Sequence, residues 1–82
     1  MNYPMFSDVV LLQDLPEENL CAGDIGTVVD YHVVEGLEPG YSLEFFDMMG
    51  DTVAVTIVPE SYLRSPTHTD RPAVRIANEV TA

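Results

Sequence analysis

The most informative segment of this chain is Asp8-Val-Val-Leu-Leu-Gln-Asp-Leu-Pro-Glu-Glu-Asn-Leu-Cys-Ala-Gly-Asp-Ile-Gly-Thr-Val-Val29. Residues 8–13 are mainly β-branched and apolar, which predicts a first strand. Pro16 and the two glutamates after it suit the start of a helical turn, but the segment is too short for more than one 3-10 turn. Gly23 and Gly26 then predict a tight reversal into a second strand. This order of elements is typical of the start of a small antiparallel barrel.

The rest of the chain up to residue 64 predicts further short strands separated by turns. No segment has the apolar period of a long helix, and Gly, Pro and Asp recur between the apolar runs. A second 3-10 turn is expected at Pro59–Tyr62. We therefore expect an all-β fold, a small SH3-like barrel of about five short antiparallel strands. After the first strand, the predicted strands cover residues 26–34, 41–45, 52–57 and 63–64.

Two of these strands alternate between apolar and small or polar residues, which predicts one buried and one exposed face. Closing such a sheet into a barrel would remove its exposed edges and fill its interior with side chains, leaving no cleft. The side chains expected to face the core are Tyr41, Leu43, Phe45, Val53, Val55 and Ile57.

The chain of 82 residues is long enough for one domain, which we expect to be a barrel over residues 1–64. Residues 65–82 contain Pro66 and Pro72 and lack a regular period, so we expect an extended arm that is flexible or docks on a partner. Cys21 is the single cysteine, and neither a signal peptide nor a membrane-spanning apolar run is present. These features favour a soluble cytoplasmic protein.

The same residues resemble a known family. The carrying motifs are Asp14-Leu-Pro-Glu17, Gly23-Asp-x-Gly-Thr-Val-Val29, Tyr41-x-x-Glu-Phe45 and Ala54-Val-x-x-Val58. Together they are similar to a bacterial family of short SH3-like-barrel proteins that is catalogued as a domain of unknown function. The resemblance covers about residues 6–64 and implies the fold, but it implies no activity and no catalytic or binding residue. Some members are thought to lie near toxin–antitoxin or immunity genes.

The charges restrict the choice of partner. The formal net charge is −11, and the first 63 residues contain no lysine or arginine. Such a body repels phosphate backbones, so nucleic-acid binding by the barrel is disfavoured. The acidity either keeps a small domain soluble or presents an acidic surface to a basic partner. The three basic residues are Arg64, Arg71 and Arg75.

No group of residues has the spacing of a catalytic or metal site. Cys21 has no basic neighbour in sequence that would activate its thiol, and His32 and His68 are far apart in the chain. Asp47-Met-Met-Gly-Asp51 places two carboxylates across a turn, but a calcium loop needs six or more oxygen ligands. We therefore expect a hairpin turn at this position, and no enzymatic activity, cofactor, metal or membrane partner.

The leading hypothesis is a non-catalytic protein–protein interaction module with an acidic surface. One alternative is an antitoxin or immunity-type protein that neutralises a basic toxin. Another is a structural subunit or homo-oligomer assembled through residues 65–82. The apolar candidates at the hairpin tip either contact a partner or cover the barrel and the loop at 35–40. The candidate partner-contact residues are Asp14, Glu17, Glu18, Asp24, Phe46, Met48 and Met49.

Overall fold

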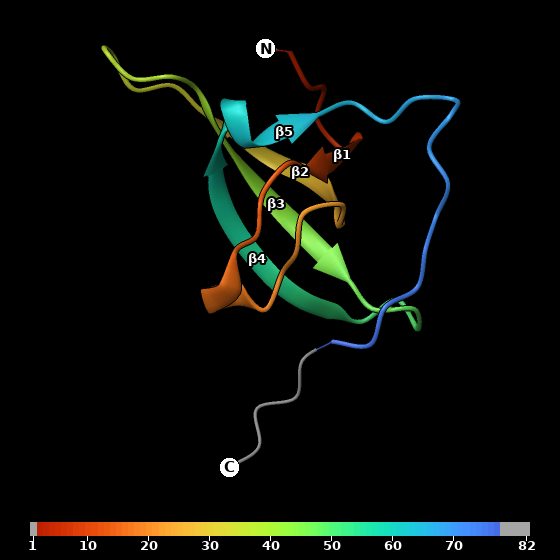
Figure 1. The fold of residues 1–82 in the computed structure, drawn as a ribbon. Helices are drawn as coiled ribbons and strands as arrows, with labels where there is room; N and C mark the ends of the chain where they lie inside the picture. The colour runs from red at the N-terminus through yellow and green to blue at the C-terminus, as the bar shows by residue number, and fades with distance from the viewer. Residues whose placement is uncertain (1, 78–82) are drawn as a thin grey trace.

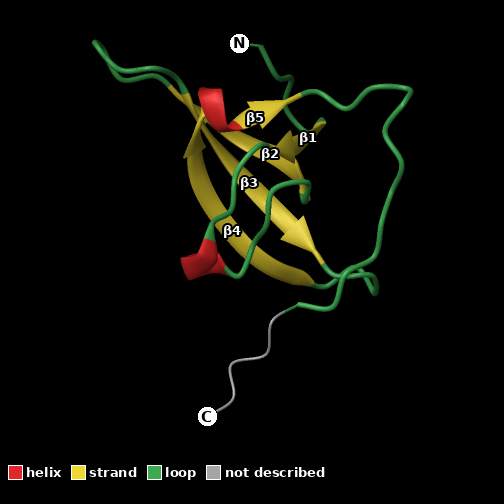
Figure 2. Cartoon of the chain, in the orientation of Figure 1, coloured by secondary structure: helices red, strands yellow, loops and turns green. Residues whose placement is uncertain are grey.

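A computed structural model describes residues 2–77 of the chain (Figure 1). The described part is all-β, with five strands and two single 3-10 turns, which confirms the fold class expected from the sequence (Figure 2). The elements are β1 (Asp8–Leu11), η1 (Pro16–Glu18), β2 (Ile25–His32), β3 (Gly40–Phe46), β4 (Thr52–Pro59), η2 (Glu60–Tyr62) and β5 (Leu63–Arg64).

The strands form one sheet in the order β4-β3-β2-β1-β5, and every neighbouring pair is antiparallel. The sheet curls into a half-barrel, and η2 leads the chain from β4 into β5 (Figure 1). Within the described residues β4 and β5 each have a single strand neighbour. The expectation of a closed barrel without edges is therefore wrong, because β4 and β5 are joined by a 3-10 turn rather than paired.

The core lies on the concave side of the curled sheet. On β3 the side chains of Tyr41, Leu43 and Phe45 are buried, which confirms the alternation expected for that strand. Leu20, from the loop after η1, is also buried, and Leu15 and Leu20 form a bridge that folds this loop back on itself. The remaining members of the core cluster are Val9, Leu11, Val28, Val58 and Leu63.

The expected facing of β4 is wrong. Val53, Val55 and Ile57 are 58%, 59% and 64% exposed, so they point away from the core. Opposite residues of an antiparallel pair lie on the same face, and Tyr41 and Phe45 stand opposite Val58 and Ala54. Residues 54, 56 and 58 therefore face inward. The predicted alternation of inward and outward residues on β4 is correct, but the set that faces inward was assigned wrongly. That set is determined by the β3–β4 register, which shifts between Phe45 and Phe46.

Candidate functional site

The loop between β1 and β2 is held by its own aspartates. The Asp14 carboxylate accepts a hydrogen bond from the backbone N–H of Ala22 at 2.8 Å. The Asp24 carboxylate accepts one from the N–H of Cys21, also at 2.8 Å. These bonds place η1, which carries Glu17 and Glu18 in its acidic turn, beside one end of the sheet. The loop is thus a fixed platform with carboxylates on its surface.

The segment of residues 73–77 lines a surface groove of about 430 Å³, here called the arm groove. The groove lies between the loop after η1, the start of β2 and the β3–β4 hairpin. In Figure 1 the chain after β5 runs around the outside of the sheet and reaches that hairpin. Beside the arm, the lining residues are Glu18, Asn19, Leu20, Asp24, Ile25, Phe45, Phe46, Asp47, Met48 and Val53.

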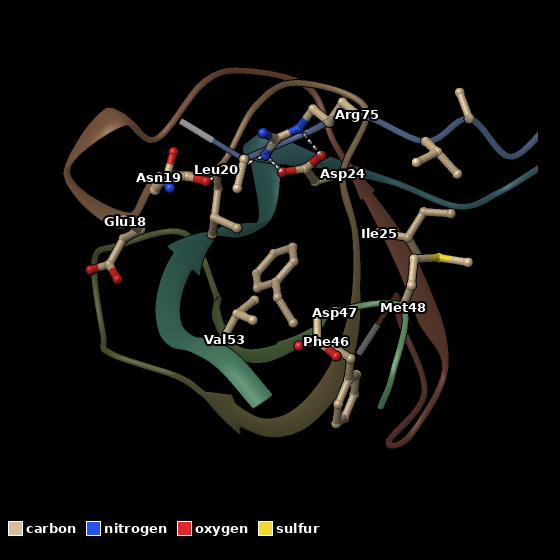
Figure 3. Close-up of a pocket in the computed structure, with 14 residues that line it drawn as sticks. Glu18, Asn19, Leu20, Asp24, Ile25, Phe46, Asp47, Met48, Val53 and Arg75 are labelled. Carbon is tan, nitrogen blue, oxygen red and sulfur yellow. Dashed lines mark hydrogen bonds and ion pairs between the residues drawn. The ribbon is translucent and has the colours of Figure 1, made fainter. Parts of the chain in front are cut away.

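The arm is joined to the groove through a two-point ion pair. Arg75 Nη2 donates to Asp24 Oδ2 at 2.6 Å, and Arg75 Nε donates to Asp24 Oδ1 at 3.1 Å. The same Nη2 lies 3.3 Å from the backbone oxygen of Asn19. Figure 3 shows the guanidinium of Arg75 directed at the Asp24 carboxylate. Such a fork-to-fork pair fixes the orientation of the guanidinium as well as its position.

The electrostatics of this pair favour its charged form. Partial burial by itself raises the pKa of Asp24, but the hydrogen bonds from Arg75 and from the N–H of Cys21 outweigh it, so the pKa is lowered from 3.8. The hydrogen bond to Asp24 raises the pKa of Arg75 in turn. The groove therefore stabilises a bound arginine and a deprotonated aspartate together.

The linkage predicts that acid releases the arm. Because the pKa of Asp24 is lowered in the folded state, the ion pair contributes fully above the ordinary value of 3.8 and is lost as the pH falls through the lowered value. We expect the amide signals of residues 73–77 to shift below about pH 4 towards positions typical of a free chain. NMR titration of the wild type and of Asp24→Asn checks this. A shift of the same size and midpoint in both would contradict it.

The basic residues of β5 and of the arm are engaged within the chain. Arg64 makes a bidentate pair with Asp70, with both N–O distances 2.8 Å. This pair lowers the pKa of the Asp70 carboxyl, which also accepts a hydrogen bond from the N–H of Thr67. Arg71 donates to the backbone oxygens of His68 and Asp70. Arg64 and Arg75 are thus each neutralised by an aspartate, which leaves them poorly placed to neutralise phosphates.

The structure brings several of the predicted contact residues together. Glu18, Asp24, Phe46 and Met48 all line the arm groove. Glu18 also lines a second groove of about 430 Å³, here called the edge groove, in which residues 14–18 face residues 56–59 of β4. Asp14 and Glu17 therefore belong to the edge groove.

Met49 lines neither groove and is 86% exposed. The hairpin turn at residues 47–51, which contains Met49, is confirmed, because Asp47 Oδ1 accepts hydrogen bonds from the N–H groups of Met49 and Asp51. This carboxylate is occupied by its own turn, as in an Asx-turn.

The contribution of the arm was not predicted. No partner of Arg75 was predicted, although an acidic body followed by arginines is a signal for intramolecular pairing. Val53 was also missed as a lining residue, because the expected phase placed it in the core.

Residues with possible chemistry lie elsewhere. His32 Nε2 is 2.7 Å from Ser42 Oγ on the neighbouring strand β3, and Cys21 is half-buried with a free thiol. Among residues 2–77 no cluster of three or more His, Cys, Asp or Glu residues is arranged to hold a metal ion.

Comparison with known proteins places the chain in a family. No curated protein and no solved structure matches it. Over the described residues, no helix has the length and apolar character needed to cross a membrane. The family model described as "Domain of unknown function (DUF4926)" matches residues 5–65, which covers the sheet and ends where the arm begins. The chain therefore belongs to this family, as the motifs between Asp14 and Val58 had indicated.

Proposed function

We propose that the protein is a non-catalytic interaction module whose arm groove binds an extended, arginine-bearing segment of a protein partner. The observation that carries this proposal is the seating of Arg75 on Asp24, with both carboxylate oxygens engaged. The arm shows the chemistry that the groove accepts, since one arginine lies between small and apolar neighbours. A partner segment of the same kind would compete with the arm for the same contacts.

Two further observations support a partner rather than a permanent internal contact. Among the described residues 71–77, no backbone–backbone hydrogen bond to the sheet or its loops is present, so the Arg75–Asp24 ion pair, the hydrogen bond from Arg75 to the Asn19 oxygen and side-chain packing hold this segment. Phe46 and Met48 at the groove are 47% and 82% exposed even with the arm in place. Exposed aromatic and methionine side chains beside a fixed charge are suited to binding adaptable partners.

The net charge of −11 supports a basic partner, because an acidic surface speeds encounter with it. A basic toxin held by an immunity-type protein is one such partner. A reducing compartment such as the cytoplasm is consistent with the free thiol of Cys21.

A titration with a synthetic peptide that copies residues 70–77 tests the proposal. In the full-length Arg75→Gln variant the arm loses its ion pair, and we expect the peptide to bind at least about tenfold more tightly than to the wild type. Arg71→Gln is the matched control, because within residues 2–77 the Arg71 guanidinium donates to the backbone oxygens of His68 and Asp70 and not to the groove. It should leave the affinity unchanged.

Adding Asp24→Asn to Arg75→Gln should remove this gain. Asparagine keeps an oxygen that can accept a hydrogen bond from the N–H of Cys21, but it loses the negative charge that holds the guanidinium. Equal peptide affinity in Arg75→Gln, Arg71→Gln and the double variant would reject the proposed site.

The second candidate function is self-assembly through the arm, with Arg75 of one copy on Asp24 of another. It is favoured by the absence of backbone–backbone hydrogen bonds between residues 71–77 and the rest of the described chain, since an exchanged arm would form the same Arg75 contacts. Sedimentation of the wild type and Arg75→Gln distinguishes the two functions. Self-assembly requires a wild-type oligomer that the substitution dissociates.

A further inference from the structure

The edge of β4 that does not pair with β3 has features that most natural edge strands avoid. β4 spans eight residues, and β3 is its one strand neighbour within the described part of the chain. Every second residue of an edge strand directs its backbone N–H and C=O away from the sheet. Natural edges are usually blunted by charges, by proline or by being short. β4 carries no charged residue, and its single proline is its last residue.

The outward face of β4 is apolar along this edge. Val53, Val55 and Ile57 are each more than half exposed and lie at every second position. On β3, the residues opposite Val55 and Ile57 are Glu44 and Ser42. Over Val55 and Ile57 the exposed apolar surface is therefore a single row along the edge, and on β3 it is extended only by Phe46 at the hairpin end. A row of this kind matches the alternating side chains of one added strand better than it matches a broad packing surface.

The wall opposite this edge is acidic. In the edge groove, residues 56–59 of β4 face a loop that carries Asp14, Glu17 and Glu18. A strand added to β4 would direct one set of side chains towards the Val53–Ile57 row and the other towards these carboxylates. Its side chains should therefore alternate between apolar and basic residues. A second copy of this chain fits poorly, because each copy carries a net charge of −11 and the same acidic wall.

We propose that the free edge of β4 is a docking site for an extended protein segment with alternating apolar and basic side chains, which joins the sheet as an additional strand. This inference rests on the proposed interaction function but uses a surface that shares only Glu18 and Val53 with the arm groove, whereas Val55 and Ile57 lie outside that groove. Backbone hydrogen bonds to β4 would supply affinity, and the carboxylates of the opposite wall would select basic segments.

The test uses the full-length chain and the synthetic peptide Lys-Val-Arg-Val-Lys-Val-Arg. We expect the peptide to bind and to slow hydrogen exchange at backbone amides of residues 52–58. Val55→Lys places a positive charge in the apolar row, where it repels the basic peptide, and should weaken peptide binding at least about tenfold. Val33→Lys is the matched control, since Val33 is 69% exposed in the β2–β3 loop and the charge change is the same. It should weaken binding by about twofold or less.

Several outcomes would overturn the inference. The first is unchanged hydrogen exchange at residues 52–58 when the basic peptide is added. The second is an equal loss of peptide affinity in Val55→Lys and Val33→Lys. The third is that the acidic peptide Glu-Val-Asp-Val-Glu-Val-Asp binds as tightly as the basic one. Self-association of the chain that Val55→Lys abolishes would assign the edge to a second copy instead. Failure here is distinguishable from failure of the arm groove, because Arg75→Gln should not alter binding of this peptide.

Discussion

Replacing Phe45 with alanine is expected to lower the free energy of unfolding by about 3–5 kcal/mol. Phe45 lies on the inward face of β3, is 2% exposed and belongs to the core cluster. Its removal leaves a cavity between strands that cannot collapse freely. A domain of this length is typically stable by about 4–12 kcal/mol, so the variant should lose a large share of its stability.

The neighbouring residue supplies the control. Phe46 has the same side chain but is 47% exposed and lines the arm groove. Phe46→Ala should therefore cost about 1 kcal/mol or less. Urea unfolding followed by circular dichroism measures both variants. Equal losses of stability would contradict the assignment of Phe45 to the core and Phe46 to the surface.

The second large effect is expected at Gly26, where β2 passes close to the same ring. A Cβ atom at this position would lie 2.8 Å from Phe45 Cζ and 2.9 Å from Phe45 Cε2. These separations are well inside normal carbon–carbon contact, so the ring or the strand must move. Gly26→Ala should lower the free energy of unfolding by about 1–3 kcal/mol through overpacking.

A smaller side chain at position 45 should relieve this clash. The double variant Gly26→Ala, Phe45→Leu is expected to be more stable than the sum of its two single effects predicts. Urea unfolding of the four proteins gives the coupling free energy. Strict additivity would show that the added methyl group and the Phe45 ring do not meet.

The sequence was sufficient for the fold class because the local signals agree with one another. The glycines of the β1–β2 loop, the alternation over residues 41–45 and the Asp47 turn each predict an element that the structure contains. The inward face of β3 followed from its pattern alone. Tyr41 is polar only at its hydroxyl, so it shares the buried face with Leu43 and Phe45.

The facing of β4 could not be predicted in the same way. Its residues are apolar on one face and small or apolar on the other, so the pattern does not say which face is buried. The register shift between Phe45 and Phe46 determines which face is buried, because Phe46 pairs with Thr52 but Phe45 pairs with Ala54, which skips Val53. Such a shift depends on how the two strands pair and not on β4 alone. This shift turned Val53, Val55 and Ile57 from expected core residues into the exposed edge.

The candidate site was predicted in part for a similar reason. The acids of the η1 loop and the apolar residues at the hairpin tip were predicted as separate contact residues. In the curled sheet four of them line one groove, namely Glu18, Asp24, Phe46 and Met48. The partner of Asp24 could not be predicted from the sequence. Arg75 lies 51 positions away along the chain, and nothing local couples the two residues.

In the proposed function, the charge of Asp24 selects the segment that occupies the arm groove. The most direct test inverts this charge in the full-length Asp24→Lys, Arg75→Gln variant and compares two peptides. One copies residues 70–77, and the other is identical except that glutamate replaces the arginine at position 75. The variant remains strongly acidic as a whole, so general electrostatic attraction still favours the arginine peptide.

We expect the charge-inverted variant to bind the glutamate peptide more tightly than the arginine peptide, whereas Arg75→Gln alone should show the opposite order. Isothermal titration at two salt concentrations measures both affinities. A preference for the arginine peptide that persists in the charge-inverted variant would rule out selection by Asp24, because binding would then follow the net charge of the chain and not the charge at position 24.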